Sequence, residues 1–433
     1  MNEEIKRGCG IDIDPQTLWV TIFITSLWGR TTNATRDFDN TIPGIEDLKK
    51  WLKKKRITHV VFESTGFYWQ MLYSMLENSF TIYVANPRHT KQLKGKKTDR
   101  LDSKTLATIL RNGAIQPSFI LPHEFRELRD LTRQYQNLIH DRVRVMNRIN
   151  QTLWNASIPL KQCMSKLFGV SGRAMIEALI KGLPGPEIAQ LARGKLRRNI
   201  PKLEVALRFP LSKHYRKILV FYWKQYLFLS KTIGQLEKEI NRRMKPYNTL
   251  VARLCTLPGV GTKLAQAILS EIGDDMSRFP SARHFASWAK LCPGNNSSAG
   301  KRKSGKNSKG NKYVQSYLVE AAWAAVRKKN CGLRDLYYRR CARLGKKKAI
   351  VSVAHKLSRI IYTMLSNEVT YDEAYESNRR PKFHGFVIHD KLRKYNDEDL
   401  VSELLSRGAR SIIWHHEDDD DADDTFAPSF ITS

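Results

Sequence analysis

Asp99 and Asp102 stand three residues apart at the start of Leu101–Arg111, a segment whose pattern predicts a helix. Side chains three residues apart project from one face of a helix, so the two carboxylates could act together. Aspartate in the first turn is also a common helix cap, and capping alone would explain the pair. The pair by itself therefore does not distinguish a cap from a carboxylate site.

Two further acids lie upstream in apolar segments. Asp12 interrupts Gly10–Ile13, and Glu63 follows His59–Phe62; both segments have the pattern of buried strands. Burying a lone carboxylate is costly, so each acid needs a partner. Separate Lys or Arg partners would satisfy them one at a time, whereas divalent cations would satisfy all four acids together. Because carboxylate-held divalent ions are a standard device for breaking phosphodiester bonds, the four acids predict a metal-dependent centre of this kind.

The charge of the chain favours a polyanionic partner. Its 433 residues include 74 Lys and Arg against 42 Asp and Glu, which gives a formal net charge of +32. Such a field attracts nucleic acid. Anionic membrane surface fits the charge too, but no amphipathic anchor or lipidation signal accompanies it. The alternative is a basic protein with no nucleic-acid partner. Separately, a length of 433 residues allows two or three domains.

The cysteines and the N-terminal region favour an intracellular protein. The six cysteines form no C-x-x-C pair and no zinc-finger spacing, so we interpret them as reduced thiols. We identify no secretory signal, and the apolar run Leu18–Trp28 is too short to cross a bilayer. We therefore expect a cytoplasmic protein with no membrane partner.

Residues 1–120 alternate between strand and helix patterns, which predicts an α/β domain with a mixed sheet. Strands are expected at Gly10–Ile13, Leu18–Thr25, Asn33–Phe38, Thr58–Phe62 and Thr81–Val84, and helices at Pro43–Lys55, Phe67–Asn78 and Leu101–Arg111.

The sequence pattern of residues 121–250 predicts two long, charged helical arms. Apolar residues follow a 3.5-residue repeat in each arm, which fits antiparallel or intermolecular coiled coils and fits the core of a helical bundle equally well. Ile180–Pro186, rich in Gly and Pro, predicts a loop between the arms. The repeat positions are Leu128, Leu131, Tyr135, Leu138, Val145 and Ile149, with Arg142 as an interruption, and Ile218, Tyr222, Leu229, Leu236 and Ile240.

Residues 251–365 begin with a hairpin motif. Leu257–Ala265 places Pro-Gly-x-Gly before an apolar helix, Leu264–Ile272. Glycines let a backbone come close, and amides at a helix start can hold a phosphate, as in a helix-hairpin-helix; an ordinary turn between helices is the alternative. On the first interpretation Gly259, Gly261 and Lys263 contact nucleic acid.

A second motif, Leu291–Gly300, consists of small residues and precedes a dense set of cations. Small residues predict a loop, and the cations predict a phosphate partner. A hydroxyl here could attack a phosphodiester because the cations would stabilise the developing charge, although an ordinary serine in a basic linker has the same composition. The cations are Lys301, Arg302, Lys303, Lys306, Lys309 and Lys312.

Two helices are expected after this motif, at Tyr313–Val326 and Arg334–Leu357. Residues 366–433 we interpret as a variable tail that is disordered in part, because Glu417–Asp424 holds seven acids in eight residues.

Several sequence phrases occur together in one order and closely resemble the DEDD-type insertion-sequence transposases. This is the family numbered one hundred and ten, whose members are bridge-RNA-guided recombinases. The resemblance covers about residues 8–112 and 254–345; the arms match in character only, and the acidic tail lies outside it. The phrases are Gly10-Ile11-Asp12, Phe62–Tyr68, Asn86-Pro87-Arg88, Lys97–Asp102, Leu257–Gly261, Leu291–Gly305 and Lys309-Gly310-Asn311.

The resemblance implies a ribonuclease-H-like (RuvC-like) first domain and a mostly helical C-terminal transposase domain, residues 251–365. Asp12, Glu63, Asp99 and Asp102 would hold Mg²⁺ in a one-metal or two-metal site, and Ser298 would be the nucleophile that joins covalently to DNA. It also implies donor and target DNA, a structured guide (bridge) RNA, and a homodimer that assembles into a tetramer at synapsis. Lys97 and Arg100 are assigned with the C-terminal cations to nucleic-acid binding.

Three departures from the family pattern bear on these assignments. Asp14-Pro15 adds an acid near Asp12, Ser103 replaces the usual Ala, and Ser297 stands where many members have an acid, so that Ser297 is a second candidate nucleophile. The preferred hypothesis is an RNA-guided recombinase that moves its own insertion sequence. The alternatives are a metal-dependent, structure-specific nuclease that uses water, as Holliday-junction resolvases do, and a non-catalytic nucleic-acid scaffold.

Overall fold

The computed structural model describes residues 5–26, 28–64, 66, 68–85, 99–115, 118–293, 296–298, 301–304, 310–329, 331–372, 386–388 and 412–414, with side chains left out for 99–101, 296–298, 301–304, 386–388 and 412–414. The chain divides into two compact units, Met1–His123 and Glu124–Ser433. Each unit has its own buried core. Within the described residues, no helix is both long and apolar enough to cross a membrane.

A five-stranded mixed sheet forms the first unit, in the order β3-β2-β1-β4-β5. β1, β2 and β3 form an antiparallel meander, and β4 and β5 continue the sheet in parallel with β1. The predicted mixed sheet is confirmed, and its third strand is longer than expected. The strands are β1 (Arg7–Ile13), β2 (Thr17–Thr25), β3 (Thr31–Asp39), β4 (His59–Glu63) and β5 (Thr81–Ala85).

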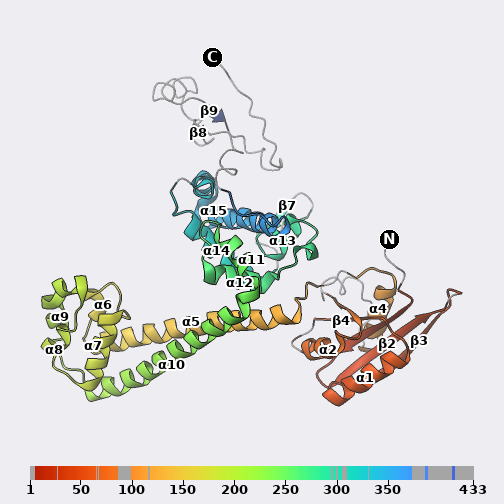
Figure 1. The fold of residues 1–433 in the computed structure, drawn as a ribbon, viewed down its shortest axis with the longest axis horizontal. Helices are drawn as coiled ribbons and strands as arrows, with labels where there is room; N and C mark the ends of the chain where they lie inside the picture. Colours follow the sequence, from red (N-terminus) through yellow and green to blue (C-terminus); the bar gives the residue numbers. More distant parts are fainter. Residues whose placement is uncertain are drawn as a thin grey trace. The chain divides into compact units, whose positions relative to one another are not determined.

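Helices cover both faces of this sheet (Figure 1). α1 (Ile42–Lys54) and α2 (Trp69–Leu76) pack on the face that holds Cys9 and Ile11 of β1. α4 (Asp99–Arg111) packs on the other face, against Val61 and Phe23. Because side chains alternate along a strand, even-numbered residues of β1 face α4. α2 is shorter than the predicted helix, and α4 begins two residues earlier than expected.

α4 lies directly against β1, and Gly10 makes this contact possible. A β-carbon at Gly10 would lie 2.3 Å from the Ser103 carbonyl oxygen and 2.4 Å from the Ala107 nitrogen. The buried Ser103 hydroxyl also shares a 2.8 Å hydrogen bond with the Thr21 hydroxyl of β2. Backbone contact and a buried hydrogen bond therefore fix α4 on the sheet.

Two long helices, α5 (His123–Asn155) and α10 (Lys213–Met244), form the arms of the second unit and pack against each other within one chain (Figure 1). Arg243, near the end of α10, donates to Glu127, near the start of α5, at 2.6 Å, so the helices are antiparallel. Of the predicted repeat positions in α10, Leu229 and Ile240 are buried, whereas Ile218, Tyr222 and Leu236 are only half-buried. The buried positions that were not predicted include Leu219, Trp223, Tyr226 and Ile233.

The arms join through a small helical lobe instead of a simple loop. The predicted loop at Ile180–Pro186 was wrong beyond Gly182–Pro184, because Gly182 ends one helix in the left-handed region (φ 86°) and Pro186 lies inside the next. Proline is tolerated in a first helical turn. The elements are α6 (Leu160–Cys163), α7 (Val170–Lys181), α8 (Gly185–Ala189), the short helix η1 (Gly194–Asn199) and α9 (Ile200–Ala206).

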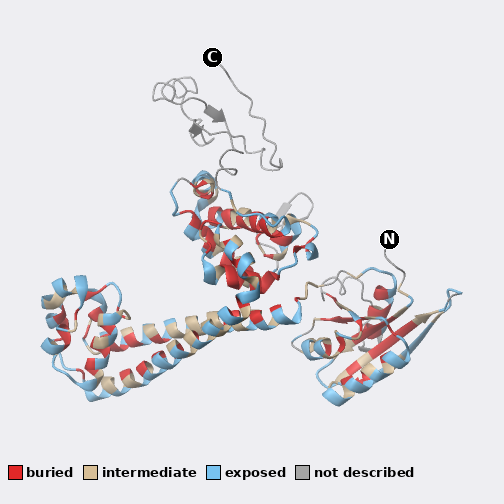
Figure 2. Cartoon of the chain, in the orientation of Figure 1, coloured by how far each residue is buried: buried red, intermediate tan, exposed pale blue. Residues whose placement is uncertain are grey.

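A helical group follows the arms, and Figure 2 shows buried residues concentrated in it and along the sheet of the first unit. Ala321, Ala322 and Ala325 are fully buried on α14, where small side chains let α15 come close. α15 is longer than predicted and breaks at Gly345 (φ 74°). The elements are η2 (Lys245–Tyr247), α11 (Asn248–Cys255), α12 (Thr262–Ile272), η3 (Met276–Arg278), α13 (Ala282–Trp288), α14 (Lys312–Ala325) and α15 (Gly332–Ser366).

The predicted tail contains a small ordered element. β8 (Phe386–Ile388) pairs in parallel with β9 (Ile412–Trp414). The acidic run Glu417–Asp424 lies outside the described residues.

Candidate functional site

Asp12 and Glu63 lie at the same edge of the sheet. β1 and β4 are parallel, with Gly10 opposite Val61 and Ile11 opposite Phe62, so the register continues to Asp12 beside Glu63. Gly10 and Val61 contact α4, and alternation along each strand turns the two acids toward the same face. Asp12 is half-buried and Glu63 is 8% exposed.

The start of α4 lies at this edge as well. Leu110, late in the helix, lies beside Gly8, whereas Ser103 and Ala107 lie beside Gly10, so α4 runs from the Asp12 end of β1 toward its beginning. Asp102 therefore comes to the edge that holds the two strand acids, and it is only 6% exposed. Asp99 is the first residue of α4, one turn earlier, and its side chain lies outside the described residues.

Three carboxylates from β1, β4 and α4 thus reach one edge of the domain, and their chemistry suits a divalent cation. Among the described side chains, however, no three His, Cys, Asp or Glu residues are grouped closely enough to hold a metal ion. Asp99, the fourth predicted ligand, is not among them. Carboxylate oxygens are suitable ligands for Mg²⁺. The described side chains alone, however, do not form a complete metal site. Asp14, the additional acid, is exposed in the turn after β1.

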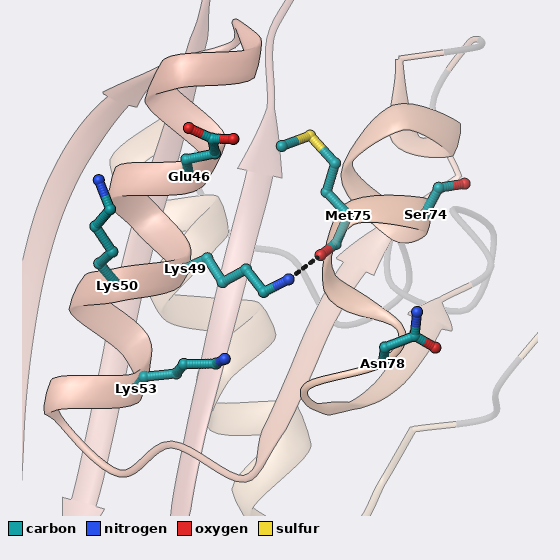
Figure 3. A pocket seen from close by; sticks show the side chains of 7 residues that line it. All are labelled: Glu46, Lys49, Lys50, Lys53, Ser74, Met75 and Asn78. Atoms are coloured by element: carbon teal, nitrogen blue, oxygen red, sulfur yellow. Dashed lines mark hydrogen bonds between the residues drawn. The ribbon is translucent and has the colours of Figure 1, made fainter.

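An open hollow of about 550 Å³ lies between α1 and α2, on the face of the sheet opposite α4 (Figure 3). Lys49 crosses it and donates to the Met75 carbonyl oxygen at 2.9 Å. Glu46 is the only acid in its lining, and none of the predicted site residues belongs to it. This hollow is therefore separate from the carboxylate edge.

Ser298 lies on a short β-hairpin of the second unit. β6 (Asn296–Ser298) pairs antiparallel with β7 (Lys301–Ser304), with Ser298 opposite Lys301. The loop predicted for Leu291–Gly300 was wrong for the three residues of β6, because they pair with β7. The strand side chains, and residues 299–300, lie outside the described part of the chain.

The turn between α11 and α12 contains the predicted glycines. Gly259 adopts φ 87°, and a β-carbon there would lie 2.2 Å from the Ala321 carbonyl oxygen, so this glycine packs against α14. Gly261 caps α12, and its β-carbon position faces open space. Lys263 forms an ion pair with Glu237 at 2.8 Å. The start of α12 is therefore open, while Gly259 faces the core.

The predicted cations are described by the structure to different extents. Lys312 is exposed at the start of α14. The backbones of Arg100 in α4 and of three β7 cations are described without their side chains, and the remaining three positions lie outside the described residues. The β7 cations are Lys301, Arg302 and Lys303, and the three remaining positions are Lys97, Lys306 and Lys309.

An ion pair with a buried carboxylate joins the first arm to α12. Arg133 of α5 donates to both carboxylate oxygens of Glu271 in α12, at 2.6 and 2.8 Å, and Glu271 is 1% exposed. The Thr132 and Ser270 hydroxyls bond beside it at 2.8 Å, and the Arg133 guanidinium lies 4.2 Å from the centre of the Tyr313 ring. Burial lowers the pKa of Arg133, but the hydrogen bond and charge of Glu271 outweigh burial and raise that pKa above its ordinary value.

Asn311 extends this network to the segment that follows β7. Its amide donates to Glu271 at 2.7 Å, and its oxygen caps α14 by accepting from two backbone amides. A β-carbon at Gly310 would lie 2.4 Å from the Trp288 carbonyl oxygen, so only glycine fits there. This network was not predicted from the sequence, although Glu271, an acid inside an apolar helix, gives the same signal as Asp12 in an apolar strand.

Removing the Glu271 side chain should destabilise the second unit strongly. In Glu271→Ala, Arg133 and Asn311 lose their shared acceptor while remaining partly buried. Because Arg133 keeps some contact with solvent, the expected cost is about 3 kcal/mol, the lower end of the range for breaking a buried pair. The free energy of unfolding in urea measures this loss. Glu237→Ala is the matched control, because its ion pair with Lys263 is exposed and should contribute under about 1 kcal/mol. Equal losses in the two variants would contradict a structural role for the Arg133–Glu271 pair.

Comparison with protein families gives two matches. A model of DEDD-type IS110 transposases matches residues 9–157, which include the carboxylate edge and the first arm. The model described as Transposase IS116/IS110/IS902 family matches residues 251–338, which include the serine hairpin.

Similar proteins occur in several bacteria. A "Probable family 20 transposase" of Pseudomonas aeruginosa is 24% identical over 72% of this chain and 85% of its own length. The transposase for insertion sequence element IS1111A of Coxiella burnetii is 27% identical over 47% of this chain and 57% of its own. A pilin gene-inverting protein of Moraxella bovis is 23% identical over 85% of this chain and 98% of its own.

These matches define the protein as a DNA transposase, an enzyme that acts on DNA. The two matched regions lie before and after the lobe and the second arm. Both match models of IS110-type transposases. The chain belongs to the IS110 family of transposases. The DEDD class suggests dependence on a divalent metal ion, in agreement with the carboxylate chemistry of the first unit.

Proposed function

We propose that this transposase is an RNA-guided recombinase that excises and inserts its own insertion sequence, using Mg²⁺ at an acidic tetrad and a serine nucleophile. The observation that supports this most directly is the arrival of acids from β1, β4 and α4 at one edge of a mixed sheet. Such an edge is suited to phosphodiester chemistry. The tetrad is Asp12, Glu63, Asp99 and Asp102.

In the proposed reaction the Ser298 hydroxyl attacks a DNA phosphorus. A bond forms between Ser298 Oγ and phosphorus, the bond to one strand oxygen breaks, and that oxygen leaves with a proton. The phosphoserine link conserves the bond for later transfer to another strand. Mg²⁺, when bound by the tetrad, would offset the phosphate charge. Lys301, Arg302 and Lys303 would hold phosphate nearby.

The turn between α11 and α12 is proposed to bind the DNA backbone as a helix-hairpin-helix. The open start of α12 at Gly261 supports this, because free amides at a helix start attract phosphate. In this proposal the role of Gly259 is structural, because this glycine packs against α14. Lys263 would have to exchange Glu237 for phosphate. Lys97, Arg100, Lys306, Lys309 and Lys312 are proposed as further contacts with nucleic acid.

The proposed partners are donor and target DNA, a structured guide (bridge) RNA, and other copies of the chain in a dimer that becomes a tetramer at synapsis. The net charge of +32 supports binding more than one polyanion. Similarity to a pilin gene-inverting protein supports DNA rearrangement as the outcome. The proposed domain limits are those of the sequence analysis, residues 1–120, 121–250, 251–365 and 366–433.

A nuclease that uses water remains the second candidate. The acids of the proposed tetrad all belong to the first unit and Ser298 to the second, so the acidic edge could act without the serine. In that case cleavage would persist in Ser298→Ala and disappear in Asp102→Ala. A non-catalytic scaffold is the third hypothesis, and it predicts that Asp12→Asn changes no activity.

RNA guidance can be tested with purified protein, donor and target DNA, and a transcript of the non-coding DNA that flanks the gene. We expect recombination only with the transcript, and we expect changes in its target-complementary segment to redirect insertion accordingly. A scrambled transcript of equal length is the control. Recombination that survives ribonuclease treatment and ignores the transcript sequence would contradict the proposal.

A further inference from the structure

One face of α10 carries a row of lysines and phenylalanines that no other described element covers. The row follows helical spacing, with steps of three or four residues, so its members lie in one line along the helix. All are exposed, and Phe221 and Phe228 are 70% and 67% exposed. We call this row the α10 stripe; it consists of Lys213, Lys217, Phe221, Lys224, Phe228, Lys231, Gln235 and Lys238.

Packing of the helix does not explain the stripe. α10 buries its opposite side, where Leu219, Trp223 and Tyr226 enter the core shared with α5 and the lobe. An exposed phenylalanine gains none of the free energy that burial of its ring would provide. Phe221 and Phe228 are both exposed, and they lie seven residues apart, about 10 Å along the helix. A surface helix without a partner ordinarily carries polar residues at such positions.

The charge of the stripe points to an anionic partner. Its five lysines extend over about 37 Å. The two acids of α10 are already engaged, Glu237 with Lys263 and Glu239 with Arg242 and Arg243. Among the described residues, no ion pair involves a lysine of the stripe. The surface is therefore strongly positive along its whole length.

We propose that the α10 stripe binds an unpaired DNA strand, with its lysines on the phosphates and Phe221 and Phe228 stacked on bases. Interleaved cations and aromatic rings are what single strands require, because every exposed base offers a ring face. Duplex DNA offers no such faces along its length. DNA is the substrate of the family, and strand exchange separates its strands. The proposal does not depend on the serine nucleophile or on guide RNA.

A second copy of the chain fits the stripe poorly. Two stripes packed together would oppose lysines with lysines and supply no acids. Phe221 and Phe228, with the half-exposed Leu227, also offer little apolar surface for a protein interface.

Binding of labelled single-stranded DNA to the full-length protein tests the proposal by fluorescence anisotropy. Each stacked ring contributes on the order of fivefold to a hundredfold in affinity, so Phe221→Ala/Phe228→Ala should weaken binding at least about twentyfold. Affinity for duplex of the same sequence should change less than about twofold. Phe209→Ala, which removes a 59% exposed phenylalanine outside the stripe, should have no effect.

The lysines are tested by salt dependence. Each phosphate contact on a single strand contributes about 0.7 to the slope of log K against log salt. Lys217→Gln/Lys224→Gln/Lys231→Gln should therefore lower the slope by about 2. The proposal is wrong if the double phenylalanine variant binds single-stranded DNA normally, if it loses affinity for RNA of the same sequence but not for DNA, or if it changes the sedimenting mass instead of affinity.

Discussion

Asp102→Asn is expected to abolish DNA strand cleavage while leaving DNA binding intact. The substitution keeps the size of the side chain and removes a charge that the proposed metal site would use beside Asp12 and Glu63. Loss of such electrostatic support should slow cleavage on the order of a thousandfold or more. A gel assay of strand cleavage under single-turnover conditions measures the rate, and filter binding measures DNA affinity. Chelation of divalent ions should abolish cleavage in the same assay.

Asp14→Asn is the matched control. Asp14 lies only two residues from Asp12, but it is exposed in the turn after β1. Its loss should leave the rate within about twofold of the unmodified protein, since surface substitutions rarely have large effects. Equal rates in Asp102→Asn and Asp14→Asn would remove the carboxylate edge from the mechanism.

Ser298→Ala is expected to eliminate the covalent protein–DNA adduct. Alanine lacks the hydroxyl that would bond to phosphorus, so no residual adduct should form at this position. Denaturing gels of reactions with labelled DNA report the adduct, and the same gels report free cleaved strands. We expect both products to disappear together.

Ser297→Ala serves as the control for this experiment. Residues 297 and 298 are neighbours on β6. The proposed reaction uses a single hydroxyl, that of Ser298, so Ser297→Ala should retain the adduct. Adduct retained in Ser298→Ala and lost in Ser297→Ala would move the nucleophile by one residue, whereas cleavage without adduct would favour the water-using nuclease.

The first domain was largely predictable from its sequence. Asp12 and Glu63 stand out because a carboxylate is rare in a buried strand, and the strand–helix alternation predicted a mixed sheet, which the structure confirms. The direction of α4 could not be predicted from the sequence, because it depends on the close approach of the α4 backbone to Gly10 of β1. That approach brings Asp102 to the edge, and it is a tertiary contact that no local pattern encodes.

The second unit was less predictable for physical reasons. Both arms carry apolar residues on neighbouring heptad positions, so periodicity alone allowed two registers for α10, and packing selected Leu219 over Ile218. The Glu271 network joins residues up to 138 positions apart in the chain, as in the Arg133–Glu271 pair. Pairing of β6 with β7 occurs in a segment whose composition is typical of loops. The role of Ser298 remains a prediction, which Ser298→Ala and its Ser297→Ala control test.

The continuity of α5 has a mechanical consequence. The helix is anchored at Arg133 by its buried pair and runs without interruption to Asn155, where the lobe begins. These 22 residues span about 33 Å, so a tilt of about 5° at the anchor swings the far end by about 3 Å. A stiff rod held near one end would act as a lever, so a small change of angle at the Arg133–Glu271 pair would move the lobe much further than it moves the anchor.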